Sequence, residues 1–156
     1  MNPDRKIKPF LFLLTCAVLL VSCSGAQIRG QSPFAQVNGM KLQDHNLTLD
    51  LGLRNVNTEA INIEHIEFSI SVDETSLSIY NATSQASVIA NGTENLRFEL
   101  AASPEAAELL NALEREDRGD LEYMLEGVLQ VNEGKQMKIK RKGHIYPVPG
   151  RPGHFR

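Results

Sequence analysis

The chain has 156 residues, of which 42% are hydrophobic and 22% charged, a composition typical of one folded domain. Its 16 Lys and Arg residues and 19 Asp and Glu residues give a formal net charge of -3, which argues against a nucleic-acid partner held by many phosphate contacts. Two cysteines are too few for a disulfide-rich scaffold or a four-thiolate zinc site.

The first 22 residues have the pattern of an export signal. Arg5, Lys6 and Lys8 precede an apolar run from Phe10 to Val21. As a helix this run is about 18 Å long at about 1.5 Å per residue, too short for a bilayer core of about 30 Å. The sequence Leu20-Val21-Ser22-Cys23, which ends the run, resembles the lipobox of bacterial lipoproteins.

The lipobox resemblance implies that residues 1–22 are removed and that Cys23 carries a thioether-linked diacylglycerol. Two or three acyl chains make a lasting anchor, because each buried CH₂ contributes about 0.8 kcal/mol. Ser24 follows where Asp would retain a lipoprotein in the inner membrane, so the resemblance implies the periplasmic face of the outer membrane. The alternative is an ordinary signal peptide that is cut near Ser22-Cys23 and leaves a free thiol.

The remaining chain is predicted to have three parts. Residues 23–33 comprise the lipidated Cys and a stretch rich in Gly, Ser and Gln that is typical of a flexible tether. Residues 34–146 carry the pattern of a folded domain, and residues 147–156, rich in Pro and Gly, are predicted to form an extended tail.

Alternating apolar residues predict strands through most of this domain. Four leucines alternate with other residues from Leu47 to Leu53, and a second alternating run begins at Ile61. The parity of the second run flips at Glu64-His65, which predicts a β-bulge that keeps both halves facing the core. Shorter strands are expected at Leu77–Ile79, at Val88, and at Leu96–Leu100 after an Asn91-Gly92 turn.

One helix is expected late in the chain. Ser103 suits an N-cap, Pro104 suits the first helical position, and the helix should end near Glu116. Its apolar face would consist of Ala106, Leu109, Leu110 and Leu113. A last hairpin should join Leu121–Val131 to a strand that contains Met137 and Ile145.

Seven or eight antiparallel strands with one helix between late strands predict a mainly β fold. The favoured architecture is a two-sheet antiparallel β-sandwich of immunoglobulin or fibronectin type III shape. A lipocalin-like barrel with a ligand cavity is the alternative.

From about Pro33 onward the sequence resembles the type 2 late-embryogenesis-abundant (LEA) family, also called the WHy (water stress and hypersensitive response) domain. The segments that carry the resemblance are LTLDLGLRNVN, INIEHIEFSISVD, LSIY, ANGTENLRFEL and YMLEGVLQV. Val56 stands where the family has Pro, so the family's Asn-Pro-Asn turn reads Asn55-Val56-Asn57 here. The resemblance implies a sandwich with one helix, a role in desiccation or other stress protection, and no established enzymatic activity.

Residues suited to catalysis are sparse. The four histidines lack the HExxH spacing of a zinc enzyme, and phosphate-binding glycine motifs are absent from the sequence. His65, at the expected bulge, is the one histidine of interest, although a locally bonded surface His is the favoured interpretation. We expect no catalytic set, no metal and no cofactor other than the covalent lipid.

Positive charge is concentrated near the end of the chain. Lys138, Lys140 and Lys142 should share one face of the last strand, and Arg141 lies between them. These four residues could contact anionic headgroups or other envelope polyanions. The favoured alternative is that the lysines protect an edge strand from pairing with other chains.

Three functions remain open from the sequence. The first is an outer-membrane-anchored, non-catalytic WHy lipoprotein that protects or stabilises the envelope under desiccation or osmotic stress. The second is an accessory lipoprotein that binds a protein partner through a sheet edge. The third is a small-ligand carrier with an apolar cavity. We expect a membrane partner through the lipid, no nucleic acid, and a monomer.

Overall fold

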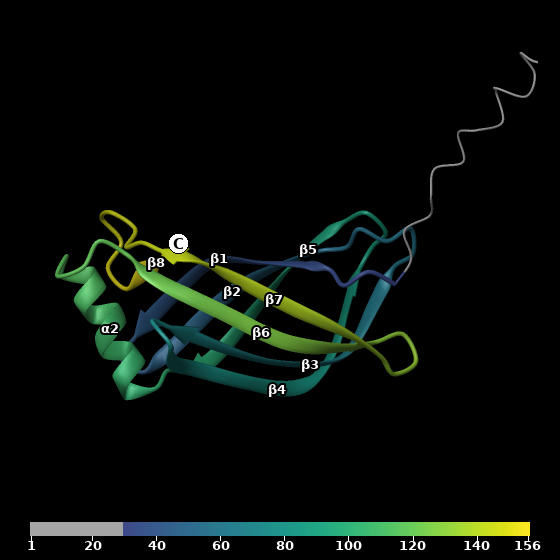
Figure 1. The fold of residues 1–156 in the computed structure, drawn as a ribbon, viewed down its shortest axis with the longest axis horizontal. Coiled ribbons are helices and arrows are strands. Elements are labelled where there is room, and N and C mark those ends of the chain that lie inside the picture. Colours follow the sequence, from purple (N-terminus) through teal and green to yellow (C-terminus); the bar gives the residue numbers. More distant parts are fainter. Residues whose placement is uncertain (1–29) are drawn as a thin grey trace, which may run out of the picture.

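Residues 30–156 are described by a computed structural model and form two packed antiparallel sheets (Figure 1). One sheet has the strand order β5-β2-β1-β8 and the other β4-β3-β6-β7. The elements are β1 (Phe34–Gln43), β2 (Asn46–Arg54), β3 (Ile61–Val72), β4 (Thr75–Val88), β5 (Thr93–Ala101), α2 (Pro104–Glu114), β6 (Leu121–Val131), β7 (Lys135–Ile145) and β8 (His154–Phe155). The predicted sandwich with one late helix is confirmed.

The strongest alternating patterns form the central strands. Leu47, Leu49, Leu51 and Leu53 are all fully buried on β2, which lies between β1 and β5. On β3 the pairing with both β4 and β6 shifts between Ile63 and His65, which confirms the predicted bulge. The bulge keeps Ile63 and Ile66 both on the core side, so the apolar face of β3 is continuous along its length.

The region after β3 differs from the prediction. Leu77–Ile79 and Val88 lie on one continuous strand, β4, and Ile79 is 71% exposed instead of buried. The cause is a second shift in the pairing of β3 with β4, which comes at Leu77. Because of it, Leu77 and Ser78 are both buried, and the next residue, Ile79, turns to solvent.

The structure adds two strands that the pattern did not predict. β1 contains an irregularity between Val37 and Gly39, so its buried residues change parity from Ala35 to Met40. The C-terminal segment, predicted as an extended tail, folds back and places β8 beside β1. Phe155 on β8 is 2% exposed, so this segment belongs to the sandwich.

Helix α2 begins as predicted and covers one end of the sandwich (Figure 1). The Ser103 hydroxyl accepts a hydrogen bond from the Ala106 N–H and donates one to the Ser76 carbonyl. The helix ends at Glu114, slightly before the expected position, and the chain takes a positive φ at Glu116. Its buried face uses Ala107 in place of Leu109, which is only partly buried.

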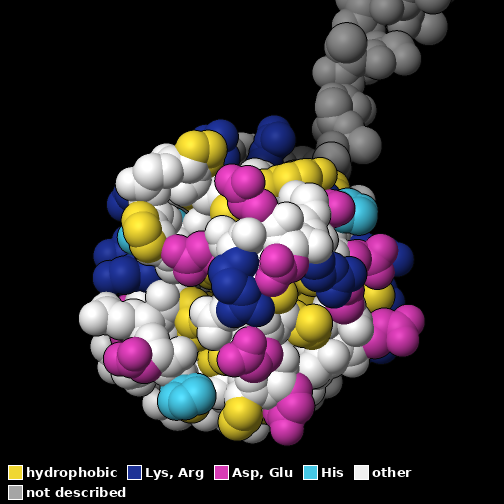
Figure 2. All heavy atoms as spheres, turned by 90° about the vertical axis from the view of Figure 1, so that its left-hand side faces the viewer, with side chains coloured by type: hydrophobic (Ala, Val, Ile, Leu, Met, Phe, Trp, Pro, Cys, Tyr) yellow, Lys and Arg dark blue, Asp and Glu magenta, His cyan; other side chains and the backbone are white. Residues whose placement is uncertain are grey.

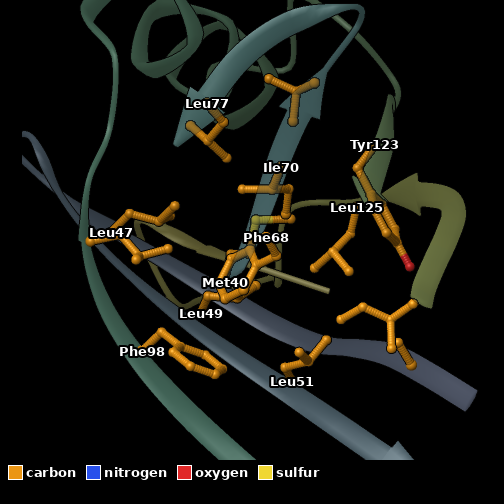
Figure 3. Close-up of a cluster of buried hydrophobic side chains, with 14 of the residues drawn as sticks. Met40, Leu47, Leu49, Leu51, Phe68, Ile70, Leu77, Phe98, Tyr123 and Leu125 are labelled. Carbon is orange, nitrogen blue, oxygen red and sulfur yellow. The ribbon is translucent and has the colours of Figure 1, made fainter. Parts of the chain in front are cut away.

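Side chains from both sheets meet in one core (Figure 3). The rings of Phe68, Tyr80 and Phe98 lie with centroids 4.8–5.4 Å apart, and leucines of β2 surround them. Each such buried side chain contributes about 1.5–3 kcal/mol. Since the strands of residues 30–156 form two separate sheets over this packed interior, the lipocalin-like alternative is wrong.

Within residues 30–156, no helix combines the length and the hydropathy that are needed to span a membrane. The export signal, the tether residues up to 29 and Cys23 lie outside the described residues.

Candidate functional site

The Asn55-Val56-Asn57 turn is a buried hydrogen-bonding centre between the two sheets. Asn55 is fully buried, and its side-chain amide donates to the carbonyls of Glu59 (2.8 Å), Val88 (3.1 Å) and Ile89 (3.1 Å). Its side-chain oxygen accepts from the backbone and side-chain N–H groups of Asn57, each at 2.9 Å. The turn is therefore closed by side-chain bonds with Val56 at its centre, where a Pro would preset φ.

Asn57 extends this centre to the start of the described chain. Its side-chain amide donates to the Gln31 carbonyl and accepts from the Gln31 N–H, both at 2.8 Å. Backbone bonds from Asn55 to Gly92 and from Asn91 to Asn57 add the loop between β4 and β5. We call Asn55, Asn57 and the groups that they bond the asparagine clamp. The clamp holds in place Gln31, which lies within the last residues of the predicted tether.

Lys138, Lys140 and Lys142 of β7 lie together on the outer face of its sheet, as the alternation predicts. Lys140 Nζ lies 2.5 Å from Glu126, and Lys142 Nζ lies 2.8 Å from Glu122 on β6. Lys138 faces Val128 and has no acidic partner among the described residues. Because β7 is an edge strand and two of these three lysines are paired with carboxylates, the arrangement favours edge protection over anion binding.

Arg141 does not share the lysine face. It has the same parity as Ile139, and it borders a shallow groove of about 290 Å³ with Phe34, Gln36 and Arg54. The four cations predicted as one contact surface are thus divided between two faces of the sheet.

Several ionisable side chains near α2 are also paired. His144 Nδ1 lies 2.5 Å from Asp120, Arg115 pairs with Asp117 at 3.1 Å, and Arg118 pairs with Asp73. Figure 2, which views this end of the molecule, shows acidic and basic side chains interspersed. His65 lies at the bulge as predicted, and its Nε2 bonds the Asn81 side chain at 2.7 Å, so it is a locally bonded surface histidine.

A larger groove was missed by the sequence reasoning. It occupies about 680 Å³ on the outer face of the sheet that contains β1, β2 and β5, and residues 148–156 form one wall. We call it the C-terminal groove. Its residues come from three strands and from the segment predicted as an extended tail, so no local motif marks it. The signal that could have found it is the pair of residues Gly150 and Gly153, which allow the tail to turn back.

Polar contacts cross the floor of the C-terminal groove. Arg97 Nε lies 2.7 Å from Asp50, and this hydrogen-bonded ion pair raises the pKa of Arg97 above its ordinary value. The Thr48 hydroxyl donates to Glu99 at 2.9 Å. No cluster of three or more His, Cys, Asp or Glu residues in the described part of the chain could hold a metal ion.

No family model and no curated protein matches the chain. Among solved structures, AT1g01470 from Arabidopsis thaliana is 16% identical with a TM-score of 0.56, over 85% of this chain and 91% of that protein. The sandwich fold is shared. A candidate LEA protein, At2g46140.1, is 18% identical with a TM-score of 0.49 over 95% of this chain and 88% of that protein. A protein from Archaeoglobus fulgidus is 11% identical with a TM-score of 0.47, over 76% of this chain and 97% of that protein.

Proposed function

We propose that this chain is a lipid-anchored, non-catalytic protein of the LEA/WHy type that protects or stabilises the bacterial envelope under desiccation or osmotic stress. The observation that carries the proposal is the asparagine clamp, because the turn motif of the sequence resemblance forms a built structural element here. The shared sandwich fold is consistent with that resemblance.

The lipid anchor is supported by the lipobox and by the position of the clamp. Residues 24–29 separate Cys23 from Gly30. At about 3.3 Å per residue, the distance between the Cα atoms of Cys23 and Gly30 is at most about 23 Å. Because Asn57 binds Gln31 directly, an acylated Cys23 would hold the clamp end of the sandwich close to the bilayer. The sandwich would then act at the membrane surface.

The anchor is tested by mass spectrometry and fractionation. In cells that express the full chain, we expect the mature N-terminus to be an acylated Cys23 in the outer-membrane fraction. Cys23→Ala should leave an unacylated precursor, and Cys16→Ala is the matched control because it changes the other cysteine of the chain. An unmodified Cys23, or equal membrane retention of the Cys23→Ala protein, would refute the anchor.

The protective role has a separate test. Deletion of the gene should lower survival of drying and of osmotic shock, and the full chain should restore it. The purified protein should preserve the activity of a labile enzyme through drying better than an equal mass of serum albumin. Survival equal to wild type, with protection no better than albumin, would contradict the stress role and leave the anchor unaffected.

A further inference from the structure

The C-terminal groove has the size and rigidity of a small-molecule site. Its volume of about 680 Å³ lies within the range of about 300–1,000 Å³ that is usual for such sites. Its floor is the outer face of β1, β2 and β5, which are joined by antiparallel pairing with a single irregularity in β1 between Val37 and Gly39. A ligand would therefore meet a floor that does not have to be ordered on binding.

The wall of the groove is also fixed. The Leu42 N–H donates to the Gly153 carbonyl at 2.8 Å, and the Gly153 N–H donates to Glu114 of α2 at 3.0 Å. Arg156 and Tyr146 exchange two backbone hydrogen bonds of 2.9 and 3.0 Å. These bonds hold the backbone that carries the basic side chains of this wall.

The charges of the groove are unequal. Of the two carboxylates, Asp50 forms an ion pair with Arg97, and Glu99 accepts a hydrogen bond from the Thr48 hydroxyl but keeps its charge. By contrast, Lys41, Arg151 and Arg156 border the groove, are exposed, and have no acidic partner among residues 30–156. The three unpaired cations outnumber the one unpaired carboxylate, Glu99, so the net positive charge of the groove favours a ligand with more than one negative charge.

The hydrogen-bonding groups of the floor narrow the class of ligand. The Asn38 amide, the Thr48 hydroxyl and the Glu99 carboxylate present donors and acceptors along the floor. The apolar side chains Phe155 and Met40 of the lining are 2% and 3% exposed, and most of the other lining residues are polar or charged. The accessible surface of the groove is therefore mainly polar. This chemistry suits hydroxyl groups together with anions and does not suit a hydrocarbon ligand.

We propose that the C-terminal groove binds a short saccharide that carries two or more anionic groups, either carboxylates or phosphates. Lys41 and Arg151 bind the anionic groups, and the polar floor accepts the sugar hydroxyls. The site is independent of the lipid anchor and of the stress role, because its residues lie in neither the signal nor the clamp.

The test is isothermal titration of the full chain in a nonionic detergent with four probes. These are trigalacturonate, fructose 1,6-bisphosphate, inorganic tripolyphosphate and neutral maltotriose. We expect at least one anionic saccharide to bind with a dissociation constant below about 1 mM, and maltotriose to bind at least tenfold more weakly. Binding of trigalacturonate alone assigns the site to carboxylates, and binding of the bisphosphate alone assigns it to phosphates.

Variants locate the site. Lys41→Gln with Arg151→Gln should weaken binding of the anionic saccharide at least tenfold, whereas Lys138→Gln, an exposed unpaired lysine on the other sheet, should change it less than twofold. Melting curves of each variant check that the fold is kept. No binding of either anionic saccharide up to about 10 mM, tripolyphosphate binding alone, or an equal loss with Lys138→Gln would overturn the proposal.

Discussion

Replacing Asn55 tests whether the clamp is a major source of stability. In Asn55→Ala the side-chain oxygen no longer accepts from the Asn57 N–H, and the amide no longer donates to the carbonyls of Glu59, Val88 and Ile89. The bonds to Asn57 and Val88 are buried, so water cannot readily replace the lost partners.

The expected cost follows from these two buried groups. A buried polar group that loses its partner costs about 1–3 kcal/mol, so two such groups give about 2–6 kcal/mol for Asn55→Ala. For a domain of this size, 1 kcal/mol corresponds to about 4 °C in Tm. We therefore expect Tm to fall by about 8–24 °C. Asn55→Asp should be at least as destabilising, because a carboxylate keeps the acceptor, removes the donors and buries a charge.

Thermal and urea denaturation followed by circular dichroism measure these differences. Asn95→Ala is the matched control, because Asn95 is exposed and its side chain bonds only the exposed side chain of Asn38. The control should shift Tm by less than about 2 °C, as surface substitutions usually do. If the Asn55→Ala and Asn95→Ala proteins have the same Tm, the assignment of the clamp as a structural element is refuted.

Three further changes test the packing and the edge of the sandwich. Gly127→Ala should lower the free energy of unfolding, measured by urea denaturation, by about 2–4 kcal/mol, because a Cβ there would clash with the Glu67 carbonyl and with Phe68. The control Gly119→Ala, where a Cβ would lie in open space, should lower it by less than about 1 kcal/mol. Gly153→Ala should release β8 from β1, because Gly153 has a positive φ and a Cβ there would clash with the Leu42 carbonyl. Amide hydrogen exchange at Leu42 should then become faster, and unchanged protection of this amide would contradict the prediction. Changing Lys138, Lys140 and Lys142 to Gln should increase aggregation on heating without altering co-sedimentation with anionic vesicles at low salt; loss of vesicle binding would instead support a membrane contact.

Strand periodicity predicts this fold well wherever one strand keeps one parity. The leucines of β2 alternate without interruption, and the Ser103-Pro104 pair locates the start of α2 from local chemistry alone. The bulge in β3 was also predictable, because strong apolar residues stand on both sides of the parity change.

The same reasoning failed where the partner strand decides the outcome. Ile79 is exposed because the pairing with β3 shifts at Leu77, and nothing within LSIY itself requires that shift. β8 has only two residues, and its place beside β1 depends on the turns at Gly150 and Gly153. The C-terminal groove depends on that placement, so it could not be derived before the tail was located.

The clamp and the C-terminal groove lie at different positions along the length of the sandwich. The described chain enters at the clamp end, and α2 and β8 lie toward the opposite end (Figure 1). β2 runs from Thr48 in the groove to Arg54 beside the clamp, about 20 Å at about 3.3 Å per residue. Under the proposed anchoring, the clamp end faces the bilayer and the groove lies farther from it. Ligand binding at the groove therefore requires no displacement of the anchor, and a Cys23→Ala protein should bind the anionic saccharide as tightly as wild type.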